Sequence, residues 1–160
     1  MEVEFFTEPV YKSARASYNV FASYISKVAQ ELGLTRALEI LSSTYEDIGA
    51  YRGSNYKNQS EIKNFNAEKA FPILKKAVEE LGTDYEIMQM DPKEVIVKLG
   101  KCPMYEGAKF GGLDPENICH CGAIKYMNTL LKQLNPKLEY EINKIKADEK
   151  DFCTTTLKLK

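Results

Sequence analysis

Thiols and one imidazole are the side chains in this sequence that suit metal binding or nucleophilic chemistry. Cys119, His120 and Cys121 stand in a row, with Cys102 before them and Cys153 after them along the chain. These are all four cysteines and the only histidine among 160 residues. Thiolates and imidazoles ligate zinc, thiolates hold iron–sulfur clusters, and a thiolate beside a base is a nucleophile. The row indicates a metal site, a nucleophile with its base, or buried core residues.

The predicted topology brings cysteines from distant segments together. The helix that contains Cys119 runs for about 23 Å from that residue, and the strand after it returns by about 30 Å. Cys153, at the start of the last strand, should therefore reach the level at which the helix begins. Cys102 follows an earlier strand and leads into the same end of the molecule. We expect the thiols to meet in one region, and we name Cys102, Cys119, Cys121 and Cys153 as candidate metal ligands.

The spacing within the row limits what its residues can do together. On a regular helix His120 falls near the centre of the apolar face, and Cys119 and Cys121 flank it about 200° apart. Either two of the three serve one ion, or the first turns are distorted. Cys102 precedes Pro103 at the predicted N-cap of a short helix, where free N–H groups favour an anion. Cys102 is therefore the first candidate for a thiolate.

Hydrophobic periodicity predicts three helices in the first half of the chain. Apolar residues recur three or four apart over 7–32, 35–48 and 66–81. Thr7 and Asn66 are the candidate N-caps of the first and third helices, and a glycine follows each of these two helices. The polar sequence YRGSNYKNQS, after the second helix, predicts a loop. Tyrosines on these helices fit a core, or alternatively Tyr18, Tyr45 and Tyr51 line a ligand cavity.

The second half changes to a period of two, which indicates strands. It predicts two strands, a short helix, a longer helix that opens at Asp114-Pro115, and two more strands, over 84–90, 94–100, 103–110, 114–134, 137–143 and 152–160. We therefore predict an α+β fold with a mainly antiparallel four-stranded sheet. The whole chain, 1–160, forms one domain in this prediction, with a helical half over 1–82 and a ββαββ half over 84–160.

Composition narrows the function classes. Hydrophobic residues make up 44% and charged residues 28% of the chain, as in a globular protein. The 22 basic and 23 acidic residues are interspersed and form no basic stripe, so we predict no nucleic-acid partner. No apolar run is long enough for a membrane span, and an acidic start unlike a secretory leader favours the cytoplasm. Thiols stay reduced there, which favours ligands, nucleophiles or core residues over disulfides.

The C-terminal part of the chain resembles the L-2-amino-thiazoline-4-carboxylic acid hydrolase family. The shared features are Cys102-Pro103 opening a short helix, Cys119 near the start of the next helix, Asn135-Pro136 before a strand, and Cys153 two residues into the closing strand. More remotely, the arrangement is similar to 4-vinyl-reductase-like sensing domains, whose cysteines hold zinc beside a small-molecule cavity.

The resemblance implies hydrolysis of a cyclic C=N bond in a small amino-thiazoline, which releases an S-carbamoyl cysteine type of product. Cys102, Cys119 or Cys121, and Cys153 are the matched positions, either as metal ligands or as the source of a nucleophile. Cys102 and His120 are then the catalytic pair, with His120 as the base.

Two other functions stay open. The chain is alternatively a non-catalytic domain that binds or senses a small molecule, zinc or an iron–sulfur cluster. In the third interpretation it is an interaction protein whose cysteines belong to the core, because free cysteine is among the most often buried residues.

Overall fold

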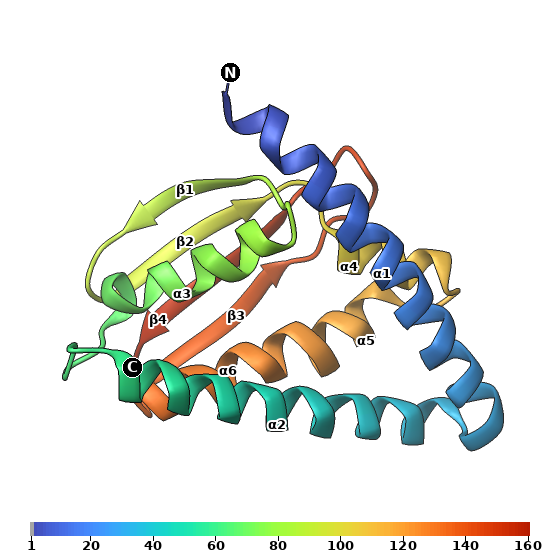
Figure 1. Ribbon diagram of the computed structural model, residues 1–160, viewed down its shortest axis with the longest axis horizontal. Coiled ribbons are helices and arrows are strands. Elements are labelled where there is room, and N and C mark those ends of the chain that lie inside the picture. Colours follow the sequence, from blue (N-terminus) through green and yellow to red (C-terminus); the bar gives the residue numbers. More distant parts are fainter. Residues whose placement is uncertain (1) are drawn as a thin grey trace.

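The computed structural model describes residues 2–160, with side chains from residue 8 onward. The first half is helical, and a four-stranded sheet with further helices follows (Figure 1). The elements are α1 (Glu2–Leu32), α2 (Leu34–Gln59), α3 (Ala67–Glu80), β1 (Tyr85–Met90), β2 (Glu94–Leu99), α4 (Pro103–Phe110), α5 (Pro115–Cys119), the π-helical turn η1 (His120–Ile124), α6 (Lys125–Leu134), β3 (Leu138–Lys144) and β4 (Cys153–Leu159). None of the helices in this described part is long and apolar enough to cross a bilayer.

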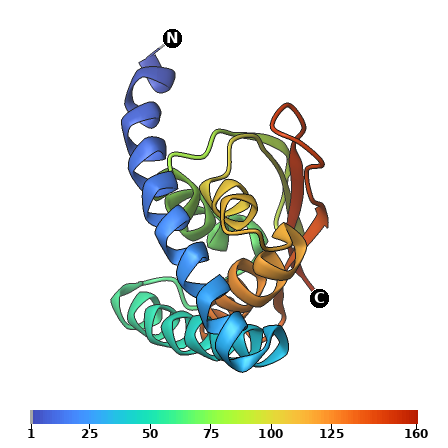
Figure 2. The same cartoon turned by 90° about the vertical axis from the view of Figure 1, so that its right-hand side faces the viewer.

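The sheet confirms the predicted α+β class. Its strand order is β1-β2-β4-β3, and every neighbouring pair is antiparallel. β4 therefore lies between β2 and β3, which makes β1 and β3 the two edges. The helices cover one face of the sheet, and Figure 2 shows β3 and β4 beside them. The other face carries charged side chains, such as Lys158 paired with Glu139 and Glu141.

Short-range signals fixed most helix ends where the sequence predicts them. Gly33 has a φ of 87° between α1 and α2, a conformation that suits glycine. The Asn66 side chain caps α3 by accepting the N–H of Lys69 at 2.8 Å. Asp114 caps α5 in the same way, through the N–H of Glu116. The predicted start at Thr7 is wrong, because the helical backbone of α1 begins at Glu2.

The predicted loop after the second helix is also wrong, because α2 continues to Gln59. Gly49 and Gly53, four residues apart, face α6 at very close range. A Cβ at Gly49 would lie 2.6 Å from the carbonyl oxygen of Tyr126, and one at Gly53 would lie 2.5 Å from that of Leu130. Gly53, which belongs to the predicted loop, and Gly49 before it thus permit close helix packing, which holds this polar stretch in the helix.

Two hydrophobic clusters make up the core. The first joins α3, α6 and the inner face of the sheet, and its most buried members include Val95, Leu130 and Leu157. The second joins α1, α2, α4 and the start of the α5–α6 helix around residues such as Ile25 and Ile118. Ile142 packs against both clusters, so β3 links them.

Candidate functional site

A cavity of about 470 Å³ lies where the two clusters meet. The cavity is partly open to solvent, and its lining is mainly aliphatic and aromatic. Its walls come from α1, α2, α3, the start of α4, the α5–α6 helix and the inner face of the sheet. They consist of Tyr18, Tyr45, Ile48, Arg52, Leu74, Ala77, Val78, Glu80, Leu81, Thr83, Leu99, Cys102, Met104, Cys119, Ala123, Tyr126, Met127, Tyr140, Ile142, Cys153 and Thr155.

Three of the four predicted cysteines line this cavity. Cys102 is the N-cap residue of α4, Cys119 is the last residue of α5, and Cys153 is the first residue of β4. Their segments are far apart in sequence, and the expected convergence is real for these three thiols. Cys121 is half-buried and is not among the lining residues. The roles of the cysteines as ligands or nucleophile stay predictions.

His120 points away from this region, which corrects the expectation that it lies at the centre of an apolar face. Its side chain is 54% exposed, with Nε2 3.8 Å from a carboxylate oxygen of Glu116. The cause is the π-helical turn over His120–Ile124, which holds one residue more than an α-helical turn. The extra residue rotates the side-chain positions of α5, before the turn, by about 100° around the helix axis relative to those of α6. Cys119, only 6% exposed, takes the inward position instead.

The distortion of this helix was foreseen as one of two alternatives, and the structure contains it. Gly122 sits inside the π-helical turn against the ring of Tyr45 from α2. A Cβ at Gly122 would lie 3.1 Å from that ring, so only glycine fits without displacing it. π-Helical turns occur often at functional sites. Here the turn brings Cys119 and Ala123 to the cavity wall.

Burial keeps the cavity thiols neutral. It raises the pKa of Cys119 well above the ordinary value, and the neighbouring Cys102 and Cys153 raise it further. The pKa of Cys102 is also raised, chiefly by burial. The N–H groups of Tyr105 and Met104 at the start of α4 lower it without reversing that direction, and the thiol makes no capping hydrogen bond. Desolvation outweighs the helix N-terminus at Cys102, which favours the neutral thiol over the predicted thiolate.

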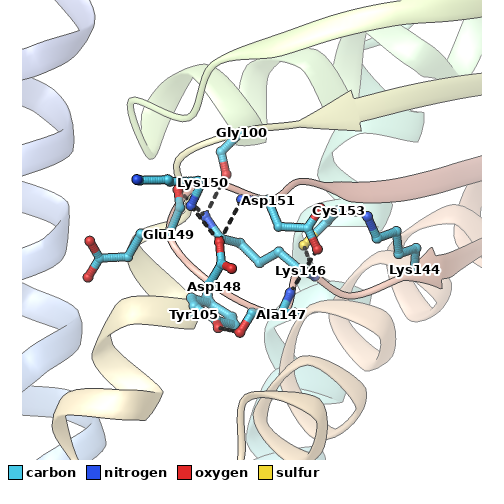
Figure 3. A network of polar contacts seen from close by, with 10 residues as sticks. All are labelled: Gly100, Tyr105, Lys144, Lys146, Ala147, Asp148, Glu149, Lys150, Asp151 and Cys153. Carbon is cyan, nitrogen blue, oxygen red and sulfur yellow. Dashed lines mark hydrogen bonds and ion pairs between the residues drawn. The ribbon is translucent and has the colours of Figure 1, made fainter.

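Cys153 has the most polar surroundings of the three thiols. Its Sγ accepts the backbone N–H of Lys146 at 3.3 Å. The Lys146 side chain, only 3% exposed, donates from Nζ to the carbonyl oxygens of Gly100 at 3.2 Å and Glu149 at 3.5 Å, and lies 5.2 Å from the centre of the Tyr105 ring (Figure 3). Burial still raises the pKa of Cys153, although Lys146 lowers it.

Two threonine hydroxyls at the cavity have no hydrogen-bond partner among the residues that the structure describes. Thr83, before β1, is 4% exposed, and Thr155, on β4, is 1% exposed. Thr155 influences the pKa of the adjacent Tyr140 phenol, but the two hydroxyls do not meet hydrogen-bond geometry. An unpartnered buried hydroxyl is costly, so both are suited to a ligand. Neither threonine is among the site residues predicted from sequence, although Thr155 shares the inner face with Cys153 and Leu157, where a polar residue is unusual.

Arg52 and Glu80 occupy the rim of the cavity. Both side chains are about half exposed, and the guanidinium lies 3.9 Å from the Glu80 carboxylate. Arg52 also donates to the Tyr126 hydroxyl at 3.2 Å and lies 5.9 Å from the centre of its ring. The alternative prediction of a tyrosine-lined cavity is right for Tyr18 and Tyr45 and wrong for Tyr51, whose side chain is 70% exposed.

A metal ion requires several donor side chains around one point. Among the described side chains, no three His, Cys, Asp or Glu residues are arranged to hold a metal ion. Cys102, Cys119 and Cys153 all line the cavity, but no coordination site is found among them in the described part of the chain. No family model and no curated protein sequence matches the chain.

Proposed function

We propose that this protein binds a small, largely apolar organic molecule in the cavity between its two hydrophobic clusters. The observation that carries the proposal is the cavity itself, about 470 Å³ with mainly aliphatic and aromatic walls. Small-molecule sites in proteins have this size, and their apolar walls carry a few polar groups that orient the ligand. The unpartnered hydroxyls of Thr83 and Thr155 are such groups.

Binding without catalysis fits the chemistry of the site better than hydrolysis does. A cysteine nucleophile needs a thiolate or a base within hydrogen-bond reach. Burial raises the pKa of Cys102 and of Cys119, which favours the neutral thiol. His120, the predicted base, is exposed beside Glu116 and is not one of the lining residues.

The test of this function is to fill the cavity and measure binding of a neutral apolar dye. Ala77→Leu on α3 and Ala123→Leu on the π-helical turn each place a larger side chain in the cavity. N-phenyl-1-naphthylamine, whose fluorescence rises in apolar surroundings, should bind the wild type saturably and each variant at least tenfold more weakly. Ala16→Leu, on the exposed face of α1, is the matched control and should bind like the wild type. Absent saturation, or equal binding by all variants, would refute the proposal.

The amino-thiazoline hydrolase is the second candidate, and the three thiols that line the cavity favour it. Purified protein should then convert the thiazoline to the S-carbamoyl product. Cys102→Ser should abolish turnover, whereas Cys121→Ser, the same change outside the cavity, should preserve it. No turnover by the wild type would remove this candidate.

Zinc or an iron–sulfur cluster stays a prediction for the same thiols. Elemental analysis and an optical spectrum of anaerobically purified protein distinguish the two. A structural zinc contributes on the order of 10 kcal/mol to folding, so a chelator should then lower the melting temperature strongly. A metal-free protein with an unchanged melting curve would contradict this prediction.

A further inference from the structure

We propose that the ligand is a carboxylic acid, whose anionic group binds Arg52 at the rim while its apolar body fills the cavity. The inference rests on the proposed binding function and adds the chemical class of the ligand. Its support comes from the geometry of Arg52, the charge balance at the rim and the neutrality of the inner walls.

Arg52 is held in place while most of its donors stay available. A guanidinium carries five N–H donors in a planar fork that matches a carboxylate. One hydrogen bond to a side chain, with the Tyr126 hydroxyl at 3.2 Å, fixes Arg52 against the ring that it overlies. Glu80 lies 3.9 Å away, beyond hydrogen-bond distance. The fork can therefore receive a bidentate partner without losing its contact with Tyr126.

The charges at the rim favour an anion. One oxygen of Glu80 lies 3.9 Å from Arg52, and the other lies 4.0 Å from Lys76. Two cations thus face one carboxylate, which leaves this group with one net positive charge. All three side chains are about half exposed, and such ion pairs are weak. Rearranging Arg52 toward a ligand therefore costs little.

The deeper walls offer hydrogen bonds but no charge. Burial raises the pKa of Tyr45 and of Tyr140, so both phenols stay neutral, as does the thiol of Cys119. Arg52 and Glu80 are the charged residues of the lining, and both belong to the rim. An anionic group therefore has its counter-ion at the rim, and an apolar body has its place inside.

Three probes with one body and different charges test this inference. They are 4-phenylbutanoate, 4-phenylbutanamide and 4-phenylbutylamine, each measured by calorimetry and by displacement of N-phenyl-1-naphthylamine. We expect the acid to bind at least tenfold more tightly than the amide, because charge-assisted hydrogen bonds are stronger than neutral ones. The amine should bind most weakly, because its positive charge is repelled by Arg52. Equal binding of acid and amide would overturn the inference and leave the binding function standing. Failure of all three and of the dye would overturn both.

Matched variants assign the preference to one side chain. Arg52→Gln should remove the tenfold preference for the acid and leave amide binding unchanged, and Glu80→Gln should strengthen acid binding alone. Arg15→Gln is the control and should keep the preference. Arg15 has similar neighbours, because it lies 5.9 Å from the centre of the Tyr11 ring and 3.8 Å from Glu106. It does not line the cavity. A preference that persists in Arg52→Gln would refute the assignment.

Discussion

The cavity thiols and phenols illustrate how burial changes single residues. Their pKa values rise because the neutral form tolerates the low-dielectric wall better than the anion. These groups therefore ionise at lower pH in the unfolded chain, where they are in water, than in the folded protein. The chemistry that the sequence predicts for Cys102 depends on which of two neighbouring influences is stronger, the helix N-terminus or the surrounding apolar residues.

The free energy of unfolding should fall at alkaline pH. An unfolded thiol ionises near its ordinary pKa of 9.0, whereas buried Cys119 keeps its proton, so the unfolded state binds fewer protons. The contribution of each such thiol to stability should thus be constant below about pH 8 and fall by about 1.4 kcal/mol per pH unit above pH 9. Tyrosines with raised pKa values, such as Tyr140, should steepen the fall above pH 10. Urea unfolding under reducing conditions measures this, and Cys119→Ala should flatten the slope between pH 9 and 10. A wild-type stability that rises over this range would contradict the prediction.

Lys146 should set the reactivity of the thiols beside it. Its ammonium lowers the pKa of Cys153 and of Cys102, so Lys146→Met should raise both and slow their alkylation severalfold at pH 8.5. The variant retains the backbone N–H that Cys153 accepts. Peptide-resolved mass spectrometry of iodoacetamide labelling measures each cysteine, and Cys121, outside the cavity, is the internal reference. Faster labelling of Cys153 in the variant would refute this role.

Helix contacts decide the course of α2. Alanine normally stabilises a helix interior by about 1 kcal/mol relative to glycine. Gly53→Ala should instead lower the free energy of unfolding by about 1–3 kcal/mol, because its Cβ would lie 2.5 Å from the Leu130 carbonyl oxygen on α6. Chemical denaturation measures the change. Ser43→Ala, on the exposed face of the same helix, should stay within about 0.5 kcal/mol of the wild type. A stabilised Gly53→Ala protein would show that the two helices can separate freely.

One side chain of α6 completes the edge of the sheet. Asn128 donates to the carbonyl oxygen of Tyr140 at 2.9 Å and accepts its N–H at 2.8 Å, as a neighbouring strand would. Asn128→Ala should cost about 1–3 kcal/mol, because it leaves both backbone groups of a buried residue without this partner. Asn128→Asp keeps the acceptor and should cost less. Thermal unfolding tests the order, with exposed Asn117→Ala as the unaffected control. Equal loss in the alanine and aspartate variants would argue against the paired contact.

At the scale of the whole molecule, a partly open cavity of about 470 Å³ lies between the two hydrophobic clusters. Filling it should stabilise the fold, so Ala77→Leu should raise the free energy of unfolding by about 0.5–2 kcal/mol while it weakens ligand binding. Ala16→Leu, at the surface of α1, should change stability by no more than about 0.5 kcal/mol. Guanidinium titration measures both. A destabilised Ala77→Leu protein would mean that the walls are already closely packed.

Prediction from sequence succeeded where neighbours along the chain determine the structure. Asn66 and the Asp114-Pro115 pair mark helix starts because a cap bonds to N–H groups two or three residues away. It failed at Gly53, because a glycine in the sequence is consistent both with a loop and with a close contact between two helices. It also failed at His120, since a single extra residue in one turn exchanges the inward and outward positions.

The sequence by itself determined the order of helices and strands, their capped ends and the presence of thiols in three separate segments, because these depend on local bonding and on the period of apolar residues. Only the tertiary structure decided which thiols face the cavity, that Arg52 stands at its rim, and that Thr83 and Thr155 lack partners. Those properties arise from packing between segments far apart in sequence, and burial in the cavity wall then raises the pKa of the three thiols.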